Sequence, residues 1–276
     1  MAADLGLQPV VEGAPLRGLA NLLRKEHRAW WGTRRWWVNA LLWPGALGGL
    51  VAIMLFLLPS VAEATGDPQV AAAGGPVAFG LEIGRSVFFE LGGLAVAIGV
   101  IVLCQDLIVD ERQSGVTEWL LSRPVARRAY VLAKLVAALV ALLALLVALP
   151  SVVAYLLMSA RAGAPIAPLP FLGGVGLVAL HTLCYLALTL MLGALLTARP
   201  PLLGIALGAL LGGQMLGGLL TPLLYVTPWG LLKLAAAVAG GLPVPPELLW
   251  APVAATAALS AAFVLVALAA FERAEL

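Results

Sequence analysis

The chain has 276 residues, of which 62% are hydrophobic and 11% are charged, and its mean hydropathy is +1.04. Soluble domains carry roughly 25% charged residues, so this composition excludes an ordinary soluble protein and indicates a membrane protein. The net charge of +2 does not indicate nucleic-acid binding, because the basic residues flank apolar segments instead of forming one soluble patch.

The N-terminal region is polar and is followed by an amphipathic segment. Residues 1–18 contain no charged-then-apolar leader, so we expect no cleaved signal peptide. Residues 16–31 place apolar side chains mainly on one helical face and basic side chains beside them, which predicts a helix lying in the cytoplasmic interface. The apolar set is Leu16, Leu19, Leu22, Leu23 and Trp30, and the basic set is Arg24, Lys25 and Arg28. Such a helix either only anchors the chain or has a mechanical role.

Apolar segments long enough to cross a bilayer recur along the rest of the chain. A hydrocarbon core of ~30 Å needs ~20 apolar residues. The sequence therefore predicts an all-α integral membrane protein with six transmembrane helices. These cover residues 36–58, 86–109, 129–158, 171–197, 201–224 and 248–271.

Two segments lie outside these spans on the expected outer side. Residues 59–85 are rich in Ala, Gly and Pro and resemble no folded domain, so we interpret them as a lid or a simple connector. Residues 229–242 are apolar but too short to cross, and prolines bound them on both sides. They predict a re-entrant or interfacial helix before span six.

The basic residues are distributed unevenly between the two sides of the predicted membrane. Six precede span one, five lie in residues 110–134, one follows span four and one follows span six, which makes thirteen. The opposite side has three: Arg85, Arg161 and Lys233. This positive-inside bias places both termini and residues 110–134 in the cytoplasm.

Glycines recur at helical spacing in spans one and five. Gly45 and Gly49 lie four residues apart in span one, and Gly204, Gly208 and Gly212 repeat that spacing in span five. Such rows let helix backbones approach closely in lipid. They serve packing either within one chain or between two chains of an oligomer. In span five, the polar Gln214 is also a candidate for lining a path.

Signatures of catalysis are absent from the sequence. It contains no G-x-x-x-x-G-K-[ST] phosphate-binding loop, no H-E-x-x-H and no G-x-S-x-G, so a stand-alone ATPase of that kind is excluded and a membrane enzyme is disfavoured. We therefore predict no catalytic, cofactor-binding or metal-binding residue.

A few polar residues within the apolar segments leave functional questions open. His181 and Cys184 share a helical face but lack enough partners for a soft-metal site, so we interpret them as ordinary buried residues. Glu90 and Asp106 are sixteen residues apart and point in nearly opposite directions on a straight helix, which argues against a proton relay.

Charge is concentrated between spans two and three. Eight of the thirty charged residues fall within residues 110–134, and span two is expected to continue as a helix until Ser114 and Gly115 break it. Residues 117–122 then predict a short helix with an apolar surface, and Pro124 favours the start of the next helix. An apolar surface on a short charged helix needs a partner, either a protein groove or the lipid interface.

This stretch carries a family resemblance. Residues 110–134 resemble the signature that lies between spans two and three in ABC type-2 permease subunits of ATP-binding-cassette transporters. Their sequence is D-E-R-Q-S-G-V-T-E-W-L-L-S-R-P-V-A-R-R-A-Y-V-L-A-K. The interface motif at 24–26 and the six-span layout support the resemblance. Departures are Val116, where Thr is commoner, and an N-terminal extension. The matching residues are Glu111, Gly115, Leu120, Leu121, Pro124, Arg127 and Lys134.

The resemblance implies a permease, in the bacterial cytoplasmic membrane, that pairs with two copies of a separate ABC ATPase. The ATP and Mg would lie in that partner, with no cofactor in this chain, and a second permease chain would complete a homodimer or heterodimer. The implied parts are residues 1–35 as cytoplasmic N-terminus with interface helix, 36–271 as six-span domain with coupling segment 110–128, and 272–276 as cytoplasmic tail. The implied site residues are Glu111, Gly115, Thr117, Trp119, Leu120, Leu121, Pro124 and Arg127 for ATPase coupling, Arg24, Lys25 and Glu26 in the interface helix, and Gly45, Gly49, Gly204, Gly208, Gly212 and Gln214 at a dimer or path-lining surface.

Other functions remain open at this point. An ion-driven secondary transporter would show buried paired acids or matching interrupted helices in two halves, and no internal repeat is visible. A membrane scaffold or assembly factor is a further alternative. An apolar path would suit export of a lipid, drug or hydrophobic peptide, although related permeases also handle ions and polysaccharides.

Overall fold

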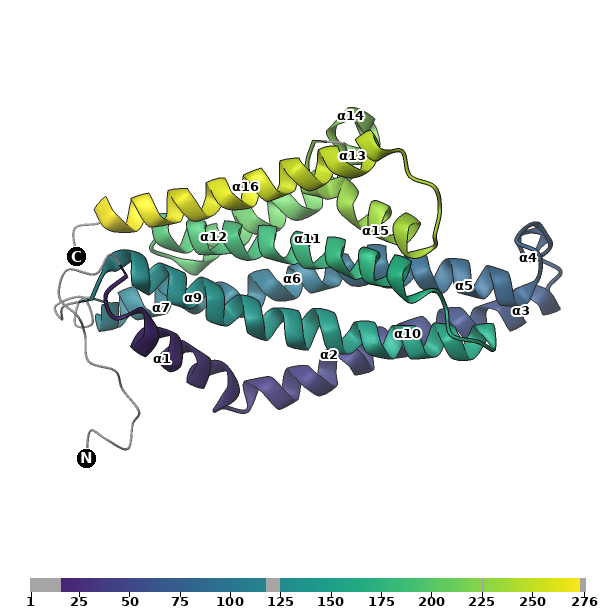
Figure 1. Ribbon diagram of the computed structural model, residues 1–276, viewed down its shortest axis with the longest axis horizontal. Helices are drawn as coiled ribbons and strands as arrows, with labels where there is room; N and C mark the ends of the chain where they lie inside the picture. The colour runs from purple at the N-terminus through teal and green to yellow at the C-terminus, as the bar shows by residue number, and fades with distance from the viewer. Residues whose placement is uncertain (1–15, 118–124, 225, 274–276) are drawn as a thin grey trace.

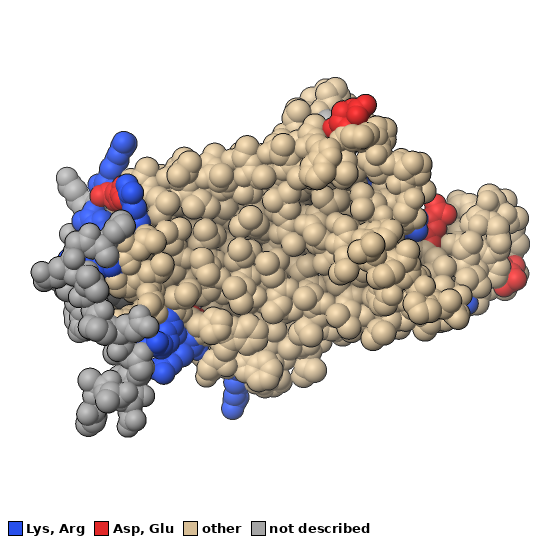
Figure 2. Space-filling model, in the orientation of Figure 1, with Lys and Arg blue, Asp and Glu red and all other residues tan. Residues whose placement is uncertain are grey.

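The computed structural model describes residues 16–117, 125–224 and 226–273 as an elongated bundle of helices (Figure 1). The start of α1 and the end of α16 lie at the same end of the bundle, and α3, α4 and the start of α5 lie at the opposite end. We call the first the basic end and the second the far end. Figure 2 shows why: Lys and Arg side chains gather at the basic end, and the long middle of this face carries almost no charge.

Six helical segments are long and apolar enough to cross a membrane, as the sequence predicted. Their middles agree with the predicted spans, and several continue farther than expected. They are Arg35–Ala64, Pro76–Gln113, Arg127–Ala162, Pro168–Leu195, Arg199–Gly217 and Pro246–Arg273.

Four of the six spans are built from shorter elements, and spans four and six are single helices. The first is α2 (Arg35–Ala52), η2 (Ile53–Leu57) and α3 (Leu58–Ala64); the second is α5 (Pro76–Ser86), η3 (Val87–Gly92), α6 (Gly93–Cys104) and α7 (Asp106–Gln113); the third is α9 (Arg127–Leu142), η4 (Leu143–Ala148) and α10 (Leu149–Ala162). The fourth is α11 (Pro168–Leu195); the fifth is α12 (Arg199–Leu207), η5 (Gly208–Gly212) and α13 (Gly213–Leu219); the sixth is α16 (Pro246–Arg273). The segments η2, η3, η4 and η5 are π-helical, so each holds a wider turn inside its span.

The remaining elements flank the spans. They are α1 (Leu19–Trp31), α4 (Pro68–Ala72), α14 (Thr221–Leu224), the 3₁₀ turn η6 (Pro228–Gly230) and α15 (Leu231–Ala239). The short apolar helix predicted before span six is therefore present as η6 and α15. It packs against α11 and η3, because Gly174 of α11 lets the backbone of α15 come close: a Cβ at Gly174 would lie 2.7 Å from the carbonyl oxygen of Ala235.

The far end is more ordered than the sequence indicated. Residues 59–85, interpreted as a lid or connector, form helices α3, α4 and most of α5, with a small core of Ala62, Val70 and Phe79. Pro68 and Pro76 occupy first-turn positions, where a proline starts a helix instead of breaking it. Asp67 caps α4 by accepting a hydrogen bond from the backbone N–H of Gln69 at 2.9 Å.

The main core lies around α11, which packs against α16, α15 and α6. An aromatic group lies at the start of α11. In it, the ring centroid of Phe171 lies 5.5 Å from that of Phe89 and 5.3 Å from that of Tyr155. His181 and Cys184, singled out in the sequence, are buried on the same helix. In the described part of the chain, no group of three or more His, Cys, Asp or Glu side chains is placed to hold a metal ion.

The glycine rows of spans one and five face away from their own chain. A Cβ added at Gly45, Gly49, Gly204, Gly208 or Gly212 would meet nothing within 4 Å. Packing within this chain therefore does not explain them, which leaves lipid or a second chain as their neighbour. By contrast, Gln214 of the same span donates a hydrogen bond to the Trp229 carbonyl at 3.4 Å, so it ties η6 to α13.

Candidate functional site: a charged cluster at the basic end

The helix of span two breaks at Ser114 and Gly115, where the sequence predicted. Helix α7 ends at Gln113, and Ser114 caps its last turn by donating a hydrogen bond to the Asp110 carbonyl at 2.7 Å. Gly115 follows with φ of 69°, a left-handed conformation that favours glycine. The chain therefore turns sharply away from the axis of span two at this residue.

The middle of the predicted coupling helix lies outside the described residues. Residues 118–124 belong to this gap, and they include Trp119, Leu120, Leu121 and Pro124. The described chain resumes at Val125, and α9 starts at Arg127, with Ala126 in an extended conformation. The structure therefore places the two ends of the segment, Thr117 on one side and Val125 on the other.

Both ends of the segment are anchored to other elements. Thr117 is fully buried, and its hydroxyl lies 3.4 Å from the Tyr130 hydroxyl. The Ala126 N–H donates to the Arg17 carbonyl at 3.0 Å, just before α1. The Val125 side chain packs against Gly18, whose φ of 83° is again left-handed. The start of α1 therefore lies directly against the return of the chain into span three.

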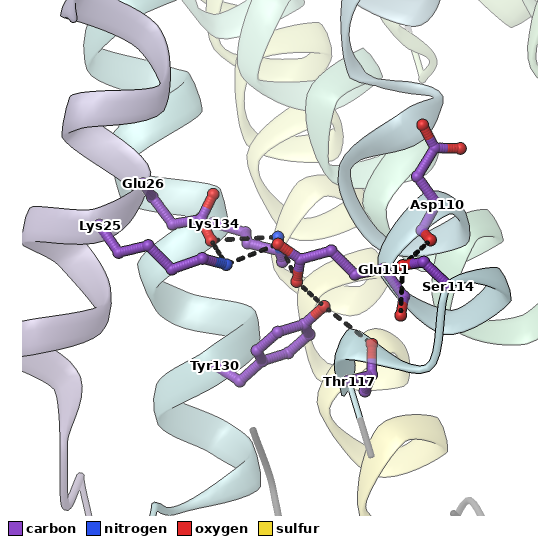
Figure 3. Close-up of polar contacts among 8 residues, drawn as sticks. All are labelled: Lys25, Glu26, Asp110, Glu111, Ser114, Thr117, Tyr130 and Lys134. Carbon is purple, nitrogen blue, oxygen red and sulfur yellow. Dashed lines mark hydrogen bonds and ion pairs between the residues drawn. The ribbon is translucent and has the colours of Figure 1, made fainter. Parts of the chain in front are cut away.

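A charged cluster of Lys25, Glu26, Glu111 and Lys134 joins α1, α7 and α9 (Figure 3). Glu111 lies between the two lysines, 2.5 Å from the Lys25 ammonium and 3.0 Å from that of Lys134. Glu26 also contacts both, at 3.0 Å from Lys25 and 3.1 Å from Lys134. Two positive and two negative charges therefore alternate across three helices.

Lys134 is the buried centre of this cluster. Its side chain is 2% exposed, against 41% for Lys25. The Tyr130 hydroxyl donates to Glu111 at 2.7 Å, and the Lys134 ammonium lies 4.9 Å from the centroid of the Tyr130 ring. Burying an ammonium costs free energy unless the ammonium is paired with a negative charge. The carboxylates of Glu26 and Glu111 supply that charge to Lys134.

The environment of Lys25 keeps it charged. Burial lowers the pKa of Lys25, but the hydrogen bond to Glu111 and the negative charges of Glu26 and Glu111 outweigh burial and raise it above the ordinary 10.5. The stabilisation from this raised pKa is fully present below the ordinary value and is lost only as the pH rises through the folded-state pKa. At neutral pH the contribution of Lys25 is therefore constant.

A second set of contacts ties the same region to the ends of α11, α12 and α16. Arg127 donates to the Glu272 carbonyl at 2.7 Å, and Arg128 forms an ion pair with the Glu272 carboxylate. The Tyr130 ring stacks on Phe271 with centroids 4.9 Å apart. Near α7, Arg199 pairs with Asp106 at 2.7 Å and also with Asp110. Asp106 therefore has an ion-pair partner at the start of α12.

The structure brings together some predicted residues and adds others. Lys25, Glu26, Glu111 and Thr117 meet in or beside the charged cluster, Arg127 lies at α16, and the glycine rows lie on the outer surface of the bundle. The sequence reasoning left Tyr130 out and noted Lys134 only as a motif match. The available signal was a lysine within span three that is followed by 26 uncharged residues, 135–160, because an ionisable residue in an apolar helix needs a partner.

These features define a polytopic helical membrane protein whose spans two and three are joined by a segment anchored at both ends beside an amphipathic helix. A model of the family described as ABC-2 family transporter protein matches residues 20–276. The chain belongs to this family. It is therefore a permease-type membrane component, in a family that generally works with an ABC ATPase and has no ATPase site of its own. A comparison with curated proteins gave no match.

Proposed function

We propose that this chain forms the membrane path of an ATP-driven exporter and that residues 110–128 transmit movement from a separate ABC ATPase. The observation that carries the proposal is the charged cluster. Glu111 contacts Lys134 and Tyr130, and Thr117 contacts Tyr130. These contacts join the chain before residues 118–124 to the chain after them. A force on the segment would therefore reach spans two and three and α1 together.

The proposal includes an orientation. The basic end, with the charged cluster and the ends of α1 and α16, would face the cytoplasm of a bacterial cell, in agreement with the positive-inside bias. The ATP and Mg would be bound by the partner ATPase, present in two copies, and this chain would hold no cofactor. We propose export in preference to import, because an apolar path would suit the export of a lipid, a drug or a hydrophobic peptide.

Replacing Leu120 and Leu121 together by Asp tests the coupling. Two carboxylates in an apolar contact cannot be desolvated without a partner, so we expect the ATPase to be lost from the purified complex while the permease remains in the membrane. The measurement is co-purification of a protein with a G-x-x-x-x-G-K-[ST] loop from native membranes in mild detergent.

The matched control replaces the same two residues by Met, which keeps the contact apolar, and it should retain the ATPase. Retention of the ATPase by the Asp variant would refute docking through this segment. Recovery of wild-type permease without any ATPase would refute the partner itself.

We further propose that the glycine rows of α2 and of α12 and η5 contact a second permease chain. Span two contacts both α2 and α12, and the glycines leave open surface on α2, α12 and η5. Close backbone approach at such rows stabilises helix pairs in lipid. Whether the second chain is identical distinguishes a homodimer from a heterodimer.

Cysteine cross-linking at Gly208 tests this contact. The two native cysteines, Cys104 and Cys184, are buried, so an introduced thiol reports on its own surroundings. For a homodimer we expect Gly208→Cys to give a disulfide-linked dimer on oxidation in native membranes. Gly176→Cys, on an open position of α11, should stay monomeric. Equal cross-linking at both positions would show random collision, and linkage of Gly208→Cys only to another protein would indicate a heterodimer.

A further inference from the structure

A cavity of about 240 Å³ opens at the far end between α5, α10, α11 and the end of α15. Its wall is mostly apolar and includes Leu81, Met158, Phe171 and Ala239. The charged residue of the wall is Arg85, which comes from the last turn of α5. One cation in an apolar cavity is an arrangement that suits an anionic group attached to an apolar body.

Arg85 has unused hydrogen-bonding capacity. It makes no ion pair with any residue in the described ranges, and its Nε atom is buried without a hydrogen-bond acceptor there. Gly240 gives the guanidinium its room, because a Cβ at that position would lie 2.5 Å from Arg85 Cζ. Buried polar groups are normally paired, so an arginine that lines a cavity and has an unpaired buried nitrogen points to a ligand.

The nearby end of α15 does not satisfy this arginine. A cation is favoured at a helix C-terminus, but the carbonyls of Ala236, Ala237 and Val238 already accept hydrogen bonds from the N–H groups of residues 240–242. The Arg85 guanidinium donates to none of them. Its acidic neighbour Glu82 lines a different pocket, on the α4 side of α5.

A second, almost wholly apolar groove of about 400 Å³ adjoins the cavity and shares Phe171 with it. It runs between α10 and α11 and is lined by Val152, Leu156 and Leu172, which are 57%, 60% and 61% exposed on the side of the bundle. Tyr155 fixes the boundary between the two, since its hydroxyl donates to the Ile166 carbonyl at 3.0 Å. The cavity that holds Arg85 and the exposed apolar groove therefore meet at Phe171.

We propose that an anionic phospholipid binds here, with its phosphate at Arg85 and an acyl chain in the groove beyond Phe171. A free anion would not use the apolar groove, and a zwitterionic lipid would bring a positive group to an arginine that has no carboxylate partner. The proposal needs only that the spans lie in a bilayer, so it does not depend on ATPase coupling. The orientation proposed above would place this lipid in the outer leaflet.

Lipid counting on the purified full-length chain tests the site. We would titrate phosphatidylglycerol or phosphatidylcholine into the protein in mild detergent and count bound lipids by native mass spectrometry. The expected result is one phosphatidylglycerol bound about tenfold more tightly than phosphatidylcholine, because both lipids offer a phosphate to Arg85 but only phosphatidylcholine brings a cation next to it. This preference should be lost in Arg85→Gln.

Two further variants separate the site from general charge attraction. Lys233→Gln makes the same charge change on an exposed residue of α15 outside this cavity, and it should keep the preference. Gly240→Ala keeps every charge but displaces the guanidinium, and it should weaken phosphatidylglycerol binding. Equal effects of Arg85→Gln and Lys233→Gln, or no effect of Gly240→Ala, would overturn the proposal. Competition by inorganic phosphate as strong as that by the lipid would overturn it too, because the site would then bind an anion without its chain.

Discussion

Replacing Lys134 by Met is expected to destabilise the basic end of the bundle by up to about 3–5 kcal/mol, because the two carboxylates of the charged cluster then share one half-exposed lysine and one negative charge is left uncompensated. The substitution keeps the length and volume of the side chain, so it creates little cavity. It leaves the Glu26 carboxylate, which is 7% exposed, with Lys25 as its remaining ion-pair partner among the described residues, and it removes one of two lysines from Glu111. Thermal unfolding of the purified protein in detergent, followed by size-exclusion chromatography, measures the loss.

Two comparisons show whether the uncompensated carboxylate charge is the cause. Lys25→Met removes a half-exposed partner of the same carboxylates and should cost at most about 1 kcal/mol. The double variant Lys134→Met with Glu26→Gln removes one charge of each sign and leaves Lys25 paired with Glu111, so it should recover part of the stability. If both lysine variants unfold at the same temperature, the buried Lys134 contributes no more to stability than the half-exposed Lys25, and this prediction is wrong.

Replacing Gly174 by Leu is expected to displace α15 from α11. Even a Cβ here would lie 2.7 Å from the backbone oxygen of Ala235 and 2.9 Å from Cβ of Ala239. Backbone cannot move aside as a flexible side chain can, so the cost should reach or exceed the ~1–3 kcal/mol typical of overpacking. The same unfolding measurement, together with protease sensitivity of the segment between α14 and α16, would record it.

Gly176 supplies the matched control on the same helix. A side chain there meets nothing within 4 Å, and replacing a glycine within a helix gains about 0.5 kcal/mol from chain entropy. Gly176→Leu should therefore be neutral or slightly stabilising in the isolated protein. A similar loss of stability in both variants would mean that the contact between α11 and α15 is not what fixes the short helix.

Hydropathy and local chain chemistry predicted much of this fold. The six spans follow from uninterrupted apolar runs, and the break after α7 follows from Gly115, whose left-handed conformation is a local property. The helices of the far end were missed because their short Ala, Gly and Pro stretches carry little periodic signal. They are fixed by first-turn prolines and by a small core that only the folded chain assembles.

The charged cluster shows where sequence reasoning stops. The density of charge in residues 110–134 was visible, but its partners lie far away along the chain: Lys25 and Glu26 in α1, and Glu272 at the end of α16. Which lysine is buried depends on how α1 packs against α9, and a charge pattern alone does not determine that packing. Much of the charge concentrated in this stretch is therefore neutralised within the chain, and residues 118–124 lie between its two anchored ends.

The π-helical turns have a mechanical consequence. Four spans contain one, whereas α11, around which the core is packed, is α-helical throughout. A π turn inserts an extra residue and weakens the regular hydrogen-bond ladder at that level. We therefore expect each of these four spans to bend more easily at its π-helical turn than elsewhere. Torque applied at the basic end would be taken up partly by bending at these π-helical turns, so the far end would move less than the basic end. Spans four and six have no such turn.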